Sequence, residues 1–368
     1  MRALQILSLV CLLSARLWAG EEPPPLAPET REPEITDKMK ASAEKACQFL
    51  AKSQNKRDGS LGSNYAVSAT SLAGMAWLAS GSTPHEGPYA ENIMLALRFV
   101  VKSQSKSGFI TENAANDGSM HGHGYATQFL ASAYGMLRDP DFAPKVGEAL
   151  EKAVHLIENT QNQYGGWNSA PNSSATDDGS GAVAIMQIAG LRTAQSCGIH
   201  VKEQVISKAK KYLADMTDQD GWYAYNWGSR SRGGGNGSAG TTGAGMYMVG
   251  AMNLQSDPKY RYDKGIKNVM ATGPFIKGSH PDNGMGWNQS WWHYTCFYCT
   301  LAIFQKGGAE WARWYPALMN ELIKQQKPDG SYNDSYGGVM TGLAALCMEM
   351  PYRYLPMFQE GGAGMEGR

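Results

Sequence analysis

The chain has no excess of either charge, few cysteines and no long apolar run beyond its first residues. Its 368 residues include 33 basic and 33 acidic side chains, so net charge gives no reason to expect binding to nucleic acid. Charged residues make up only 18%, which is typical of a folded chain. The cysteines beyond the first twenty residues are odd in number and scattered through apolar segments, so we expect buried free thiols rather than a disulfide framework. They are Cys47, Cys197, Cys296, Cys299 and Cys347.

Motifs that mark several common enzyme classes are also missing. There is no Gly-x-Ser-x-Gly elbow, no His-Glu-x-x-His helix and no Cys-Gly-Glu-Gln thioester segment. The Gly-rich segment 228–245 lacks the Lys-Ser/Thr pair of a phosphate-binding loop and follows no predicted strand. We therefore expect no cofactor and assign no metal ligands.

The first residues predict export. Met1 and Arg2 followed by the apolar run 4–13 have the pattern of a signal peptide, 1–20, cut after Ala19 or Gly20. A membrane anchor is the alternative, but this run is too short to span a bilayer, so we expect no stable span after cleavage. Residues 21–37 are acidic and rich in proline, which predicts an extended linker.

One phrase returns six times: an amphipathic helix, a short turn and an apolar segment rich in Gly and Ala. The turn is clearest at Gln161-Asn-Gln-Tyr-Gly-Gly-Trp167, and Gln326-Lys-Pro-Asp-Gly-Ser-Tyr332 keeps its spacing. Looser copies begin at Gln54, Gln104, Gln219 and Asp282. A repeat of roughly 50 residues with two helices predicts stacked helical hairpins.

The two helices of each repeat differ in character. Amphipathic segments lie at about 38–53, 90–103, 146–157, 205–216, 259–271 and 311–325, whereas segments such as 66–79, 126–137, 182–191, 245–252 and 337–346 are apolar all round. A helix that is apolar on every side is buried on every side, so the second set forms an inner layer. The last repeat keeps its apolar helix, which favours a closed ring over an open solenoid. We predict an all-α fold, a single α6/α6 toroid over 38–352, and a Gly-rich tail over 353–368.

The turns resemble those of the terpenoid-cyclase and protein-prenyltransferase group, the squalene-cyclase-like toroids, over about 38–350. Met120-His-Gly-His-Gly-Tyr125 and Trp311-Ala-Arg-Trp314 are similar to segments of exported bacterial repeat proteins of largely unassigned function. The resemblance implies a toroid with a central cavity that binds or acts on an isoprenoid or another small apolar ligand. It says nothing about a protein partner, which stays unknown.

The cyclases of this group carry an Asp-x-Asp-Asp box whose middle carboxyl protonates the substrate. The similar segment here is Ala175-Thr-Asp177-Asp178, so the first Asp is replaced. The resemblance makes Asp177 and Asp178 candidate catalytic residues, and adjacent carboxylates can raise the pKa of one of them. The alternative is that they cap the following helix. The squalene-type cyclases also have a second helical domain, for which this chain has no room.

The zinc site of the prenyltransferases requires an Asp-x-Cys pair, which does not occur in this sequence. His293, Cys296 and Cys299 are spaced along one side of a helix, but three ligands stepping along one helix rarely converge on one ion. Core packing is the favoured interpretation of these cysteines.

His121 and His123 are the other candidate catalytic residues. We expect them in a Gly-rich loop before the second inner helix, where they can serve as general acid or base at a cavity mouth. Alternatively, both satisfy backbone groups in a tight turn. Candidate ligand-binding residues at the same mouth are Asp117, Tyr125, Trp287, Trp291, Trp292 and His293, although aromatic residues can equally wedge repeats together.

Three functions remain open at this point. The first is a cyclase- or transferase-like enzyme acting on an isoprenoid, the second a non-catalytic binding or scaffold protein, and the third a carbohydrate-active toroid. The lining of the cavity should separate them: closed and apolar for the first, flat or filled for the second, open and polar for the third.

Overall fold

The computed structural model describes residues 32–111, 119–171, 179–228, 237–273 and 292–359. The candidate residues Asp117, Asp177, Asp178, Trp287 and Trp291 lie outside these ranges, as do the predicted signal peptide and the turn that begins at Asp282. Trp292 begins a helix, but its side chain also lies outside the description.

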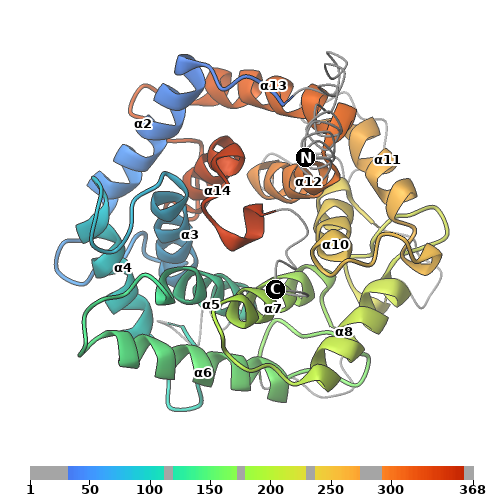
Figure 1. Cartoon of the computed structure of the whole chain (residues 1–368), viewed down its shortest axis with the longest axis horizontal. Coiled ribbons are helices and arrows are strands. Elements are labelled where there is room, and N and C mark those ends of the chain that lie inside the picture. The colour runs from blue at the N-terminus through green and yellow to red at the C-terminus, as the bar shows by residue number, and fades with distance from the viewer. Residues whose placement is uncertain (1–31, 112–118, 172–178, 229–236, 274–291, 360–368) are drawn as a thin grey trace, which may run out of the picture.

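The described chain forms two concentric layers of helices, as Figure 1 shows in a view down the ring axis. The outer layer consists of α2 (Asp37–Ser53), α4 (Ala90–Lys102), α6 (Ala143–Asn159), α8 (Glu203–Met216), α11 (Tyr262–Thr272) and α13 (Gly308–Gln325). The inner layer consists of α3 (Ala66–Ala79), α5 (Met120–Tyr134), α7 (Gly181–Ser196), α10 (Ala239–Ala251), α12 (Trp292–Lys306) and α14 (Val339–Glu349). Within these ranges there are isolated β-bridges but no strand. The predicted all-α toroid is confirmed.

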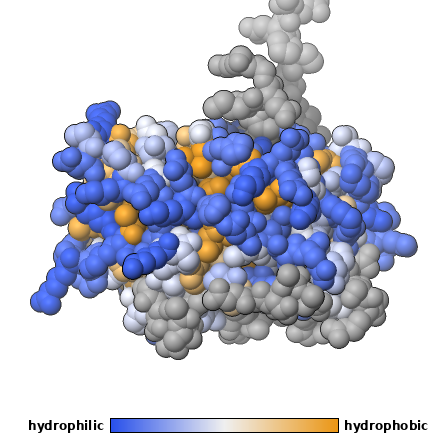
Figure 2. Space-filling view, turned by 90° about the horizontal axis from the view of Figure 1, so that it is seen from below, coloured by the Kyte–Doolittle hydropathy of each residue, from blue (hydrophilic) through white to orange (hydrophobic). Residues whose placement is uncertain are grey.

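Residue pattern determines the layer that each helix occupies. Every residue of α3 is buried, whereas α6 buries only one side, including Val146, Leu150 and Ile157. The outward sides of the outer helices carry the charges, and the side wall in Figure 2 is accordingly mostly hydrophilic, with apolar residues showing between. No helix in the described part of the chain has both the length and the apolar character needed to cross a bilayer.

The repeated glutamine has a specific structural role. The side-chain amide of Gln161 donates to the carbonyl oxygen of Gly165 in its own turn (3.0 Å) and to that of Val205 in the next outer helix (2.9 Å). Gln54 and Gln104 make the same pair of bonds in their own repeats. Each glutamine thus fastens its turn to the next repeat by satisfying a carbonyl on each side.

We call this pair of glutamine hydrogen bonds a clamp. The last clamp, made by Gln326, closes the ring. Gln326 donates to the carbonyl of Gly330 (3.1 Å) and to that of Ser42 in the first outer helix (2.9 Å). Gly330 has φ of +92°, and a Cβ at this position would collide with the backbone carbonyl of Lys45. The turn therefore needs glycine both for its left-handed backbone and for its close approach to α2.

The chain crosses the ring after α14. Residues 350–358, which we call the strap, form two short 3-10 helices, η3 (Met350–Tyr352) and η4 (Pro356–Phe358). The strap leaves α14 and contacts α7 on the opposite side of the ring, as well as α12, so it passes over the axis (Figure 1). Leu355 and Phe358 are fully buried. The packed chain thus extends beyond residue 352, where the sequence pattern places the start of the tail, because these apolar side chains fill the end of the barrel.

The end of the predicted linker is also fastened to the strap side of the ring. The Glu32 carboxylate accepts a hydrogen bond from the Trp311 indole (3.0 Å) and pairs with the Arg353 guanidinium (3.4 Å). Ile35 packs against the core. This part of the linker therefore lies on the toroid rather than extending away from it.

Candidate functional site at the mouth of the ring

The inner helices all begin at one face of the ring, because each follows its outer helix through a turn. We call this face the mouth; the strap closes the other. Ser119, Ser180 and Ser238 are the N-cap residues of α5, α7 and α10 at the mouth. Any ligand site on the ring axis must therefore be reached from the mouth.

Tyrosine side chains cross the axis inside the barrel. Tyr125 of α5 and Tyr298 of α12 come from helices on opposite sides of the ring, yet their hydroxyl oxygens are 3.5 Å apart. Tyr247 of α10 lies beside them, with its ring centroid 6.5 Å from that of Tyr298. All three side chains are buried. We call these three residues the tyrosine floor, since they fill the axis below the mouth.

The next level towards the mouth holds His121 and Tyr294. Each lies one helical turn above a floor tyrosine, at spacing i, i+4, and therefore on the same side of its helix. The Tyr294 ring packs at a tilt against that of Tyr298, with centroids 4.7 Å apart, and both His121 and Tyr294 are only partly buried. The site thus places an imidazole and a phenol ring at the level nearest the mouth, although the Tyr294 hydroxyl itself is buried. Further phenol hydroxyls lie beneath them.

Burial keeps these groups uncharged near neutral pH. Desolvation raises the pKa of the Tyr125 and Tyr298 phenols, and it raises that of Tyr294 together with the nearby Tyr125 and Tyr225. The same effect lowers the pKa of His121 to about 4. The described part of the site therefore offers neutral donors, acceptors and aromatic faces.

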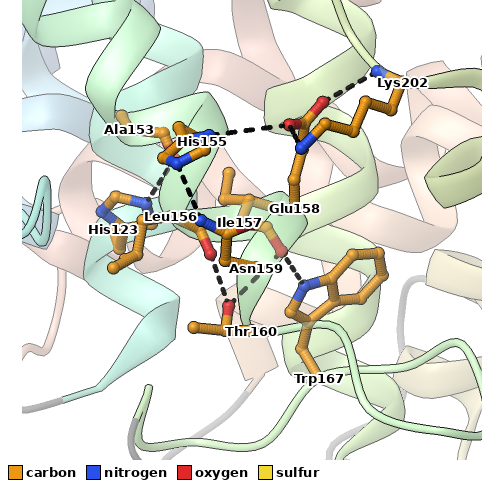
Figure 3. Close-up of polar contacts among 10 residues, drawn as sticks. All are labelled: His123, Ala153, His155, Leu156, Ile157, Glu158, Asn159, Thr160, Trp167 and Lys202. Atoms are coloured by element: carbon orange, nitrogen blue, oxygen red, sulfur yellow. Dashed lines mark hydrogen bonds and ion pairs between the residues drawn. The ribbon is translucent and has the colours of Figure 1, made fainter.

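The two histidines point in different directions. His123 is fully buried; its Nδ1 accepts from the Ile110 backbone N–H (3.1 Å), and its Nε2 donates to the carbonyl of Ala153 in α6 (3.2 Å, Figure 3). Burial lowers its pKa to about 4. His123 thus satisfies backbone groups beneath an outer helix, which is the second of the roles that the sequence left open, whereas His121 lies on the axial side of α5.

The predicted loop around these histidines is wrong. Helix α5 begins at Met120, so both residues belong to its first turn. Gly122 faces Ser68 of α3, and a Cβ at Gly124 would collide with Met186 of α7. The glycines that look like a loop in the sequence therefore allow neighbouring inner helices to approach closely.

His293 does not lie with the tyrosine floor. It is buried and packs edge-on against Tyr332 of the last turn (ring centroids 5.1 Å apart), and burial lowers its pKa to about 4. Cys296 and Cys299 are buried free thiols. In the ranges that the structure describes, no group of three or more His, Cys, Asp or Glu side chains is placed to hold a metal ion.

Ser180, which follows the two candidate aspartates in the sequence, caps helix α7. Its hydroxyl accepts from the Val183 backbone N–H (3.4 Å) and so caps α7. Asp177 and Asp178 lie outside the described residues, but neither is the N-cap residue of this helix. The capping role that the sequence offers as an alternative is therefore filled by Ser180.

Four aromatic residues near the mouth were not found from the sequence: Tyr65, Tyr336, Tyr294 and Tyr298. Tyr65 and Tyr336, at the starts of α3 and α14, pack edge-to-face at 5.1 Å. Tyr225, for which the sequence does suggest a place at the mouth, is 52% exposed beside the first turn of α7. The i, i+4 spacing of Tyr294 and Tyr298 is the signal that could have revealed the α12 side of the site. By contrast, Trp167 is fully buried and donates its indole N–H to the carbonyl of Ile157 (2.7 Å, Figure 3), as expected for a wedge between repeats.

Comparison with known proteins supports the fold. No family model matches the chain, and no curated protein matches it. Among solved structures, the type II terpene cyclase MstE from Scytonema is similar at a TM-score of 0.58 and 14% identity, covering 87% of this chain and 100% of the cyclase. The GH76A α-1,6-mannanase of Salegentibacter sp. HEL1_6 is similar at a TM-score of 0.60 and 12% identity, with coverage of 87% and 100%.

The same two proteins have been solved with ligands. The cyclase holds geranylgeranyl dihydroxybenzoate as substrate, and an inactive mannanase variant, in which two consecutive aspartates are replaced, holds α-1,6-mannotetrose. Both are (α/α)6 toroids, so the predicted resemblance to a cyclase-like toroid is confirmed at the level of the fold. At 14% and 12% sequence identity, the similarity to these two proteins shows the fold alone.

Proposed function

We propose that the toroid binds a carbohydrate at its mouth, on the surface formed by His121 and Tyr294 above the tyrosine floor. The observation that carries this proposal is the contact between Tyr125 and Tyr298 across the axis. It limits the depth of an axial site, which disfavours a long isoprenoid chain inserted into the barrel. Phenol rings with hydroxyl groups suit a sugar, because they offer a stacking face and polar edges together.

The consecutive aspartates extend the proposal from binding to hydrolysis. Asp177 and Asp178 immediately precede the capped start of α7, and replacement of two consecutive aspartates makes the mannanase variant inactive. Glycoside hydrolysis uses two carboxyl groups, one of them as an acid. We assign Asp177 and Asp178 to this role. The competing hypothesis is an isoprenoid ligand, and the binding experiment below tests both ligand classes.

The binding test uses the purified mature protein and calorimetric titration. An α-1,6-linked mannose tetramer and oligosaccharides of other linkages are compared with a C20 prenyl alcohol. We expect saturable binding of at least one oligosaccharide, weakened roughly two- to tenfold by Tyr294→Ala, since an aromatic contact contributes about 0.5–1.5 kcal/mol. Tyr354→Ala is the matched control, because Tyr354 is a 57% exposed tyrosine on the strap side. Binding of the prenyl alcohol alone would reject the carbohydrate assignment.

Hydrolysis is tested separately on the oligosaccharides that bind. Asp177→Asn should lower the rate by roughly a hundredfold or more if this carboxyl is the acid, while binding and the unfolding midpoint change little. Ser180 caps α7 in both proteins, so the variant should fold normally. Equal product formation by wild type and variant would remove Asp177 from the mechanism.

The proposal includes export to the periplasm or the medium, on the strength of the signal-like residues 1–20. In cells that carry out Sec-type export, the mature protein should begin after Ala19 or Gly20. Intact-mass measurement of the protein from each cell fraction tests this. Recovery of the full-length chain in the cytoplasm alone would contradict it.

A further inference from the structure

Ser119 differs from the equivalent serines at the mouth. Ser180 and Ser238 both accept from the backbone N–H three positions on, as an N-cap normally does. Ser119 instead accepts from the backbone N–H of His121 (3.2 Å), and its Oγ lies 2.6 Å from Nδ1 of the same residue. Of the three serines, only Ser119 is therefore paired with an imidazole.

The hydrogen bonds around Ser119 allow the direction of pairing that a nucleophile needs. A backbone N–H can only donate, so it occupies one acceptor position of the Ser119 oxygen. The oxygen keeps a second acceptor position, so the 2.6 Å contact fits either direction. In the tautomer of His121 that carries its proton on Nε2, the serine hydroxyl donates to Nδ1. In this tautomer His121 can take the proton of Ser119, and the serine is the residue prepared for reaction.

We propose that Ser119 and His121 form a nucleophile–base pair that attacks acyl esters brought to the mouth. The Ser119 oxygen forms a bond to the ester carbonyl carbon while its proton passes to Nδ1 of His121. The ester C–O bond then breaks, and the alcohol leaves with that proton. Water, deprotonated by His121, releases the acid from Ser119. The suitable substrate class is an ester carried by a mouth ligand, such as an acylated sugar.

Two features of the site agree with this chemistry. Ser119 and His121 are both partly exposed at the mouth, so a substrate can reach them. Burial lowers the pKa of His121 to about 4, so the imidazole is neutral at pH 7 and can accept a proton there, although only as a weak base. His123, two residues further on, has both ring nitrogens bound to backbone groups and cannot replace it.

The first test is labelling of the mature protein with a fluorophosphonate probe, followed by peptide mass spectrometry. We expect the label on Ser119 and none on Ser180 or Ser238, which serve as internal controls for N-cap serines. His121→Gln should slow labelling about a hundredfold or more, in line with the loss of a general base. Label on another serine, or none at all, would overturn the proposal.

The second test is hydrolysis of p-nitrophenyl acetate by wild type and Ser119→Asp. Aspartate caps a helix about as well as serine, so α5 should remain intact while the nucleophile is lost. Hydrolysis should fall to background in this variant, with an unchanged thermal unfolding midpoint. An unchanged rate would refute the role of Ser119. The inference rests on the mouth being the site but not on the sugar, so failure of oligosaccharide binding and failure of labelling are separate results.

Discussion

In the turn at Gly330, which closes the ring, the free-energy cost of close contact with α2 can be measured separately from the cost of a left-handed backbone. Gly330 and Gly198 have the same φ of +92°. A Cβ at Gly330 would collide with the Lys45 carbonyl of α2, whereas a Cβ at Gly198 would meet nothing within 4 Å. Alanine in the left-handed region costs about 1–2 kcal/mol. Gly198→Ala should therefore lower the free energy of unfolding by that amount.

Gly330→Ala should cost more than Gly198→Ala by about 1–3 kcal/mol, the usual penalty for an atom forced into packed structure. The obstacle is backbone, so it cannot move aside as a flexible side chain would. Urea unfolding followed by both tryptophan fluorescence and circular dichroism gives the two free energies and checks that the transitions coincide. Equal losses in the two variants would contradict the close approach of this turn to α2.

Three further predictions concern stability. Gln326→Met should lower the free energy of unfolding by about 1–3 kcal/mol, measured by urea titration, because the carbonyls of Gly330 and Ser42 lose their partner; no loss would contradict the clamp. Burial raises the pKa of Glu349 well above its ordinary value, so its contribution is fully present below about pH 4.3 and is lost as the pH rises towards the folded-state pKa. Glu349→Gln should therefore gain stability relative to wild type between pH 5 and pH 9, and a difference independent of pH would show that this carboxyl does not titrate as described. Phe358→Ala should cost about 3–5 kcal/mol in the same urea assay if the strap seals the barrel, and under 1 kcal/mol if it does not.

The helical layers could be predicted because their signals are local. The alternation of one-sided and all-round apolar segments identified the outer and inner helices, and the Gln-x-x-x-Gly turns marked their junctions. The clamp made by Gln161 explains why that spacing recurs: the side chain must reach both the glycine carbonyl four residues on and the next outer helix. A local pattern was therefore sufficient to predict the ring.

The site depends on contacts that no local pattern contains. Tyr125 and Tyr298 are far apart in the sequence, and helices that are apolar all round give no periodicity from which to read the side facing the axis. The opposite orientations of His121 and His123 followed only once α5 was known to begin at Met120. The strap was hidden by the glycines that follow it, although Leu355 and Phe358 were apolar enough to indicate burial.

The ion pair between Glu32 and Arg353 joins the two ends of the described chain on the side of the ring away from the mouth. A fluorophore or a solid support attached at residue 32 or residue 359 would therefore lie on the face opposite the mouth. The inner helices begin on the other face. Because the described ends and the mouth lie on opposite faces of the ring, the protein suits oriented immobilisation on a sensor surface.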